Sequence, residues 1–329
     1  MEWWSGGVVE WWSDGMSGRI LKPSAKVRCI AFLQYFITPI PFILLSPARA
    51  DVTLVAVGDV MMARGVERIC RTKGWDYPFA STRAVLNGAD ITFGNLECSI
   101  SRRGIKADRM FALRADPACL PALKRAGFSV MSVANNHTMD YGRDAFSDTL
   151  DGLVLNKIVP VGGGKTYAEA TAGIVIQKNG LRIGIVGFSA FPGAAGTLSP
   201  NKPSMAVMSD EHLTASIKAL KKKCDIVVVS CHWGIEGERS HSKMQERLAH
   251  RVIDAGAILV LGHHPHVPQE SETYRGGVIV YSLGNFVFDE KTHSGPSGLF
   301  FRCRLSKNGV TPISKMPVKI ERCQPRLLN

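Results

Sequence analysis

Short apolar segments that each end on a polar cluster recur along this chain of 329 residues. Residues 52–57 run directly into Gly58-Asp59, and residues 257–261 run into Gly262-His263-His264-Pro265-His266. Segments of this length and composition predict buried β-strands. In open α/β sheets, ligands bind just beyond the carboxyl ends of the strands. The recurrence therefore predicts an α/β fold with its functional site at the strand ends.

Three further strand-like segments, residues 91–93, 128–134 and 226–230, also end on carboxylate, amide or imidazole groups. Such oxygen and nitrogen donors form metal sites, because carboxylates and neutral imidazoles both bind divalent cations. The absence of thiolates favours Mn, Fe or Zn over Cu(I), and the imidazoles argue against Ca or Mg alone. Two such ions can clamp a phosphoryl group. The candidate ligands of one or two divalent transition-metal ions are Asp59, Glu97, Asn136, His232, His264 and His266.

The histidine cluster allows two ligand assignments. Alternate residues of an extended segment point the same way, which favours His264 and His266 as ligands. His263 would then face away and support the ligands through hydrogen bonds, and the opposite assignment stays open. Asn95 and Asn135 are expected to fix the turns of their segments through side-chain to backbone hydrogen bonds.

Helical patterns separate the predicted strands, and this alternation predicts packed sheets with helices outside. Gly127 and Gly256 follow two of the helical segments, where glycine suits a helix end. Residues 191–204 form a predicted loop between two similar halves. The predicted helices are residues 117–126, 145–158, 210–223 and 242–255.

The chain is expected to contain one domain, residues 51–310, followed by a C-terminal extension, residues 311–329. Residues 299–305 and the segment from Val310 onward suggest closing antiparallel strands. The end beyond Glu321 is basic and is expected to be loose.

The first 50 residues differ in composition from the rest. Basic residues precede an apolar stretch at 29–45, and Ala48-Arg49-Ala50 supplies small residues just before Asp51. This order is typical of a secretory signal peptide, with an uncleaved membrane anchor through residues 29–45 as the alternative. Residues before Met16 have no place in such a signal, and we exclude residues 1–50 from the fold. The expected location is the periplasm or cell envelope.

The chain is basic, with a formal net charge of +12. The first 50 residues carry five Lys or Arg and three Asp or Glu, so the remainder keeps a net charge of +10. A basic exported protein attracts an anionic polymer, a membrane surface or a phosphorylated substrate. No nucleic-acid-binding motif is recognisable, so we expect no nucleic-acid partner.

Six motifs stand in order along residues 52–289. They are Gly58-Asp59, Gly94-Asn95-Leu96-Glu97, Ala134-Asn135-Asn136-His137, His232-Trp233-Gly234, Gly262-His263-His264-Pro265-His266 and Tyr281-Ser282-Leu283-Gly284-Asn285-Phe286. This series resembles the CapA family, whose members are linked to poly-γ-glutamate capsule synthesis and have a calcineurin-like metallophosphatase fold. The resemblance implies a four-layer αββα sandwich, an anionic polymer as substrate and a membrane-bound polymer synthesis complex as partner.

The resemblance also implies residue roles and exposes departures. Asn136 matches the metal-bound amide of metallophosphatases, and His137 matches the proton donor to the leaving group. These enzymes usually open with D-x-H, whereas Met61 here stands in place of that histidine. Their bridging aspartate is replaced by Glu97, which has a longer side chain.

Two functions remain open from the sequence. The first is a metal-dependent hydrolase or transferase acting on a phosphoester or on the amide linkages of an anionic polymer. The second is a non-catalytic component that holds a polyanion, which the missing imidazole at Met61 favours. Candidate substrate-binding residues flank the motifs, with an ordinary solvated charged face as the alternative. They are Arg109, Arg114, Glu236 and Arg239.

Overall fold

The first apolar run forms β1 (Val52–Val60), an inner strand of an eight-stranded sheet in the computed structural model, which describes residues 51–193, 200–289 and 295–328. Successive side chains of a strand point to opposite faces. Leu54 and Ala56 accordingly enter one core and Val55 and Val57 another, which explains why the run is apolar throughout. The order of the sheet is β18 (Gln324–Leu327), β17 (Gly309–Glu321), β16 (Gly298–Ser306), β1, β2 (Ile91–Leu96), β5 (Val130–Ser132) and β6 (Val159–Val161), with β15 (Asn285–Val287) also paired to β1.

The second sheet has six strands and the same two-sided burial. Ile226 and Val228 of β11 face the core between the sheets, whereas Val227 and Val229 face the helices on the other side. Its order is β13 (Ser271–Tyr274), β14 (Gly277–Val280), β12 (Leu259–His263), β11 (Ile226–His232), β9 (Leu181–Ser189) and β8 (Ile174–Lys178). Two small sheets pair β3 (Ser99–Ile100) with β4 (Arg114–Ala115) and β7 (Gly163–Gly164) with β10 (Ser204–Met205).

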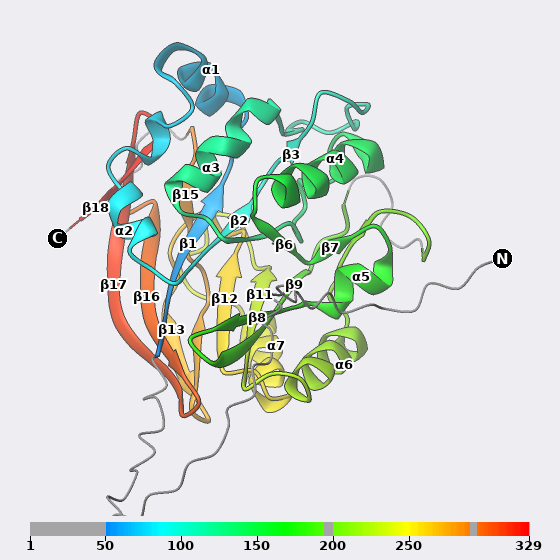
Figure 1. Cartoon of the computed structure of the whole chain (residues 1–329), viewed down its shortest axis with the longest axis vertical. Helices are drawn as coiled ribbons and strands as arrows, with labels where there is room; N and C mark the ends of the chain where they lie inside the picture. The colour runs from blue at the N-terminus through cyan, green and yellow to red at the C-terminus, as the bar shows by residue number, and fades with distance from the viewer. Residues whose placement is uncertain (1–50, 194–199, 290–294, 329) are drawn as a thin grey trace, which may run out of the picture. The chain divides into compact units, whose positions relative to one another are not determined.

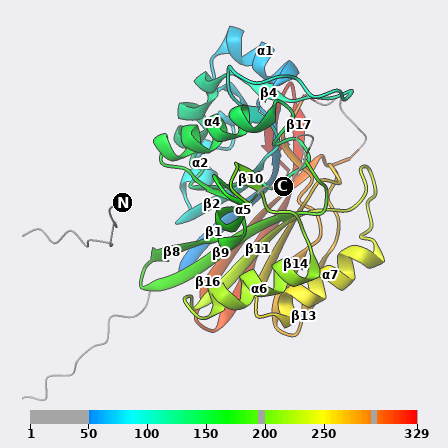
Figure 2. The ribbon, with the colours of Figure 1, turned by 90° about the vertical axis from the view of Figure 1, so that its right-hand side faces the viewer.

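Helices cover the outer faces of both sheets, so the fold is a four-layer αββα sandwich (Figures 1 and 2). The helices against the first sheet are α1 (Arg64–Lys73), α2 (Arg83–Asn87), α3 (Leu120–Ala126) and α4 (Gly142–Leu155), with the 3₁₀ turns η1 (Tyr77–Phe79) and η2 (Pro117–Cys119). Those against the second sheet are α5 (Tyr167–Ala172), α6 (Asp210–Lys221) and α7 (Lys243–Asp254).

Local sequence signals account for several helix ends. Ser242 and Gln245 form a capping box at the start of α7, in which each side chain bonds the other residue's backbone. Gly127 ends α3 with φ of 117°, a left-handed conformation that favours glycine. Four helices therefore lie within a few residues of their predicted bounds. Helix α1 was not predicted, because it buries only Val66 and Cys70 and so lacks a broad apolar stripe.

The C-terminal expectation needs correction. Strand β17 pairs with β16 along nearly its whole length, and β18 pairs back onto β17. Gln324–Leu327 are therefore part of the first sheet, and the expectation of a loose end is wrong for this segment. Arg322 and Cys323 make the turn between these strands at positive φ without glycine, which is why the hairpin escaped detection.

The predicted signal or anchor segment, residues 1–50, lies outside the described residues. Among the helices of the described part of the chain, none is both long and apolar enough to cross a membrane.

Truncation of Phe301 tests the core between the sheets. This β16 side chain is fully buried there, so Phe301→Ala should lower the free energy of unfolding by about 3–5 kcal/mol. Chemical denaturation would measure the change. Val175→Ala on edge strand β8, where the side chain is 47% exposed, is the control and should cost less than about 0.5 kcal/mol. Equal losses for both variants would contradict the two-sheet core.

Candidate metal centre

Strand pairing brings the polar segment ends together. Strands β1 and β2 run parallel, and Asp59 stands in register with Asn95. Strands β11 and β12 also run parallel, with His232 in register with His263. The carboxyl ends of both pairs therefore place their polar side chains at one end of the sandwich.

A connecting segment joins the two sheets at this end. It leaves β14 in the second sheet and enters β15 in the first, where Asn285 pairs in register with Asp59. The backbone N–H of Asp59 donates to the carbonyl of Gly284 at 2.9 Å. A side chain at Gly262 would meet the Tyr281 carbonyl, because its Cβ would lie 1.9 Å from that oxygen. The close approach of the two backbones explains the glycine that precedes the histidine cluster.

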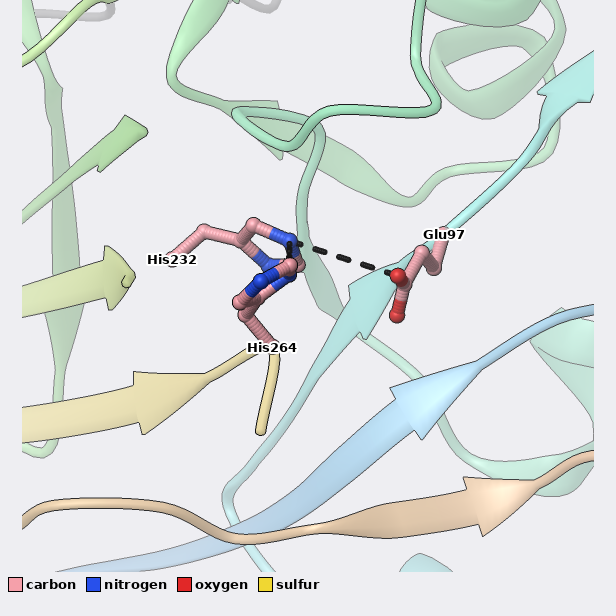
Figure 3. A group of neighbouring side chains, drawn as sticks. All are labelled: Glu97, His232 and His264. Carbon is pink, nitrogen blue, oxygen red and sulfur yellow. Dashed lines mark hydrogen bonds and ion pairs between the residues drawn. The ribbon is translucent and has the colours of Figure 1, made fainter. Parts of the chain in front are cut away.

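Two groups of side chains in this region could each hold a metal ion. In one, ligand atoms of Asp59, Glu97 and His266 lie within 4.8 Å of one another. In the other, ligand atoms of Glu97, His232 and His264 do so, and Figure 3 shows both imidazoles near the Glu97 carboxylate. Glu97 belongs to both groups, so one carboxylate can bridge two positions.

The Glu97 carboxylate is fully buried, and neither of its oxygens has a hydrogen-bond partner among the described residues. The nearest imidazole nitrogens are Nε2 of His266 at 3.6 Å and Nε2 of His232 at 4.0 Å. Burial, and then the charge of Asp59, raises the pKa of Glu97 well above its ordinary value. A buried carboxylate without partners is costly. A bound divalent cation would remove this cost, so the site fits a metal.

Asp59 is also fully buried, but each of its carboxylate oxygens accepts a hydrogen bond from the protein. Its Oδ1 accepts a hydrogen bond from Asn95 Nδ2 at 2.8 Å, and its Oδ2 accepts one from the backbone N–H of His264 at 3.3 Å. Burial alone would raise its pKa, but His263 and His266 outweigh this and hold the pKa of Asp59 well below its ordinary value. Asp59 is therefore ionised, as a ligand must be.

In the second group, two imidazole nitrogens and a neighbouring amide oxygen lie close together. His232 Nε2 lies 2.9 Å from Asn136 Oδ1 and 3.1 Å from His264 Nδ1. Burial lowers the pKa of His232, and it lowers the pKa of His264 to about 4, so both imidazoles are neutral. Neutral imidazole is the metal-binding form. Asn136, although an amide, thus lies with the two histidines as its motif predicts.

The prediction that His264 and His266 point the same way is wrong, although both side chains reach the site. Strand β12 ends at His263, and φ is 96° at His264 and 60° at His266, so the segment is not extended. The two side chains consequently serve different groups rather than pointing the same way. His263 does not face away, since its Nδ1 lies 3.3 Å from Asp59 Oδ1. It contacts a candidate ligand from inside the core.

The two asparagines expected to fix turns connect the ligand segments. Asn135 Nδ2 donates to the carbonyl of Leu96 at 2.8 Å and to Asn95 Oδ1 at 3.1 Å, and its own Oδ1 accepts from the backbone N–H of His137. Asn95 instead uses its amide on the Asp59 side chain. These bonds hold the ends of β1, β2 and β5 together.

His137 is held by a buried carboxylate that the sequence reading did not single out. Its Nδ1 lies 2.6 Å from Asp140 Oδ2, and the opposite oxygen of Asp140 accepts from Arg109 Nη1 at 2.7 Å. Arg109 also donates to the Asn136 carbonyl at 2.7 Å. Arg109 therefore supports the His137 segment through Asp140 and the Asn136 carbonyl, and its contact with substrate stays a prediction.

The other charged candidates lie in different settings. Arg114 donates to the Arg103 carbonyl at 3.0 Å and stacks over the Tyr141 ring, and no contact of it with a candidate ligand is found in the described residues. Glu236 is exposed and lies near enough to Glu97 and His264 to influence the pKa of each. Arg239 is exposed on the same loop.

Three further residues complete the surroundings. Asn285 Oδ1 lies 2.9 Å from His266 Nδ1, and the Phe191 ring packs 4.2 Å from the His264 ring. The Gly284-Asn285 pair after an apolar run repeats the motif pattern and could have indicated Asn285. Met61 is fully buried, and its sulfur accepts from the backbone N–H of Ala63 at 3.1 Å, so it takes part in the core.

A solved structure shares this architecture. It is the crystal structure of a Staphylococcus aureus protein described as a candidate 5′-nucleotidase in complex with alpha-ketoglutarate, with a TM-score of 0.50 and 14% identity. The match covers 82% of this chain and only 54% of that one, so the chain spans about half of its length. At this identity the likeness shows the fold, which is that of the calcineurin-like metallophosphatases.

Closer relatives are known from sequence. The "PGA biosynthesis protein CapA" of Bacillus subtilis is 35% identical over 272 residues, which are 82% of this chain and 72% of the relative. The "Capsule biosynthesis protein CapA" of Bacillus anthracis is 34% identical over 282 residues, covering 83% and 69%. A family model matches residues 53–290. The chain therefore belongs to the family described as bacterial capsule synthesis protein PGA_cap.

Proposed function

We propose that this chain is a metal-dependent hydrolase or transferase that acts on an anionic capsule polymer such as poly-γ-glutamate. The observation that carries the proposal is the buried Glu97 carboxylate, which is shared by two ligand groups and has no hydrogen-bond partner in the part of the chain that the structure describes. The relatives named for capsule and PGA biosynthesis support the polymer. The sequence of residues 1–50 supports an exported protein, and a membrane-bound synthesis complex is proposed as its partner.

The metal ligands, His137 and Asp140 would each have a different role in the reaction. Divalent cations held by the two groups would polarise a phosphoryl or carbonyl oxygen of the substrate. His137 lies beside this centre, and its Nδ1 contact with Asp140 leaves Nε2 to donate a proton to a leaving group. Asp140 fixes the orientation of the imidazole, and Arg109 fixes Asp140.

Met61 supports a second function, a non-catalytic component that binds the polymer. Its buried thioether occupies the position where metallophosphatases usually carry a histidine ligand. The group of Asp59, Glu97 and His266 therefore has one imidazole fewer than the family pattern. Salt-sensitive polymer binding without turnover in Mn, Fe or Zn would favour this second function.

Removal of single ligands tests the shared centre. Glu97→Ala should abolish binding at both positions, whereas His264→Ala should weaken one position only. The affinity loss should exceed the roughly 10- to 100-fold caused by loss of an outer contact to a ligand. Elemental analysis and calorimetric titration with Mn and Zn would measure it. His250→Ala, which removes an imidazole paired with Glu272, is the control, and undiminished metal content in Glu97→Ala would refute the centre.

Substitution of His137 separates proton donation from metal binding. His137→Asn should lower kcat by about 10²- to 10⁴-fold, because the leaving group loses its proton donor. Metal content should stay unchanged, since His137 belongs to neither ligand group. Phosphate release from a phosphomonoester and shortening of polyglutamate would be assayed in parallel.

Asp140→Asn gives a second readout of the same arrangement. It should lower kcat less than His137→Asn does, because the donor remains but loses its orientation. A variant lacking His137 with normal kcat would exclude the proton-donor role.

A further inference from the structure

Arg64 lies beside the metal centre without belonging to it. It follows the end of β1 and begins α1, and its guanidinium carbon lies 5.5 Å from the centre of the Phe288 ring. That ring in turn lies 5.1 Å from the His266 ring. Arg64 and the candidate ligand His266 therefore both contact the Phe288 ring.

The surroundings of Arg64 hold its guanidinium in place and leave much of it free. Phe111 lies 5.7 Å away from the guanidinium carbon on a second aromatic contact, and Asp289 pairs with Nη2. In the described part of the chain, Nε and Nη1 have no hydrogen-bond partner, and the side chain is 34% exposed. Aromatic contacts of this kind stabilise a cation and restrict its position. The guanidinium is thus pre-organised and keeps donors for an incoming anion.

The backbone at this point is strained. Arg64 has φ of 52°, a conformation that side chains other than glycine rarely adopt. The next residue, Gly65, donates its N–H to Asp289 Oδ2 at 2.9 Å, and a Cβ there would lie 2.7 Å from the Asp289 Cβ. Strain that the surrounding contacts maintain is concentrated at functional sites.

Of the three arginines expected to bind substrate, Arg109 and Arg114 have protein partners, whereas Arg239 is exposed. Arg109 donates to Asp140 and to the Asn136 carbonyl, and Arg114 lies over Tyr141. Arg64 lies outside the six motifs and contacts Phe288, whose ring also lies against His266. It is therefore a candidate for anion binding at this side of the centre.

We infer that Arg64 binds a carboxylate of a polymer unit adjacent to the unit that reacts at the metal centre. This inference rests on the proposed function and specifies its substrate as an extended polyanion. The guanidinium and the His266 ring both contact Phe288, and successive units of a chain advance several ångströms each, so a unit next to the one at the metal centre can reach Arg64. Guanidinium is suited to carboxylates through paired N–H donors. The exposed Phe111 ring, 56% accessible, offers a surface for the methylene groups of such a unit.

Binding measurements on the full chain with its metal test the inference. The probes are poly-γ-glutamate, free glutamate and inorganic phosphate, measured by calorimetry at two salt concentrations. Arg64→Gln should weaken polymer binding by about tenfold, as expected for loss of a charge-assisted hydrogen bond. Its effect on free glutamate and phosphate should be much smaller, and Arg64→Lys should recover part of the polymer affinity. In turnover, KM for the polymer should rise more than kcat falls.

Arg182→Gln is the matched control, because Arg182 is also an exposed arginine paired with an aspartate, Asp225, and lies at the start of β9. It removes the same charge and should leave polymer affinity within twofold. Metal content and thermal unfolding of every variant establish that the protein is folded.

The outcomes distinguish the role of Arg64 from the assignment of the polymer as substrate. Unchanged polymer affinity in Arg64→Gln, or an equal loss for polymer and phosphate, would overturn the role of Arg64 while leaving the metal centre intact. A wild-type protein that binds metal but no polymer would overturn both the polymer assignment and the inference built on it.

Discussion

The structure depends on the buried Glu97 carboxylate, whose charge the protein alone does not compensate. Glu97 is fully buried, both of its oxygens lack hydrogen bonds from residues 51–193, 200–289 and 295–328, and Asp59 lies close enough to raise its pKa further. Burying two carboxylates side by side would be unfavourable unless positive charge comes between them. His266 supplies part of it, since Glu97 and Asp59 outweigh the effect of burial and raise the pKa of His266 to about 10. A divalent cation would supply the rest and would displace that proton.

Placing such a centre requires both sheets. Asp59 and Glu97 come from strands of the first sheet, whereas His232 and His264 follow strands of the second. Hydrogen bonds across the junction keep these sources in register, as between the Leu283 N–H and the Gly262 carbonyl at 2.9 Å. The apolar core between the sheets therefore does more than stabilise the fold. It sets the distance between the carboxylates and the imidazoles that could share a cation.

Sequence reasoning could identify the ligand types because each follows an apolar run, and strand ends meet at one end of a parallel sheet. It could not establish the conformation of His264 and His266, whose positive φ values depend on contacts made by the folded chain. The contacts of Asp140 could not be predicted from the sequence for a related reason. Its partners include Leu113 and Arg109, which are distant along the chain and meet it only after folding. The strand β18 lacked the glycine that normally marks a tight turn.

The two ligand groups differ in charge, and this difference gives Met61 its importance. One group contains two carboxylates and a single imidazole, whereas the other contains one carboxylate, two neutral imidazoles and the nearby amide of Asn136. Nitrogen donors suit the transition metals, so the second group resembles the family pattern more closely. The first group has Met61 where the family pattern would supply an imidazole, and it adjoins Asn285, whose Oδ1 contacts His266 and whose buried Nδ2 has no partner among the described residues. An ion in the first group would therefore have to bind through Asp59, Glu97 and His266 without the histidine that Met61 replaces.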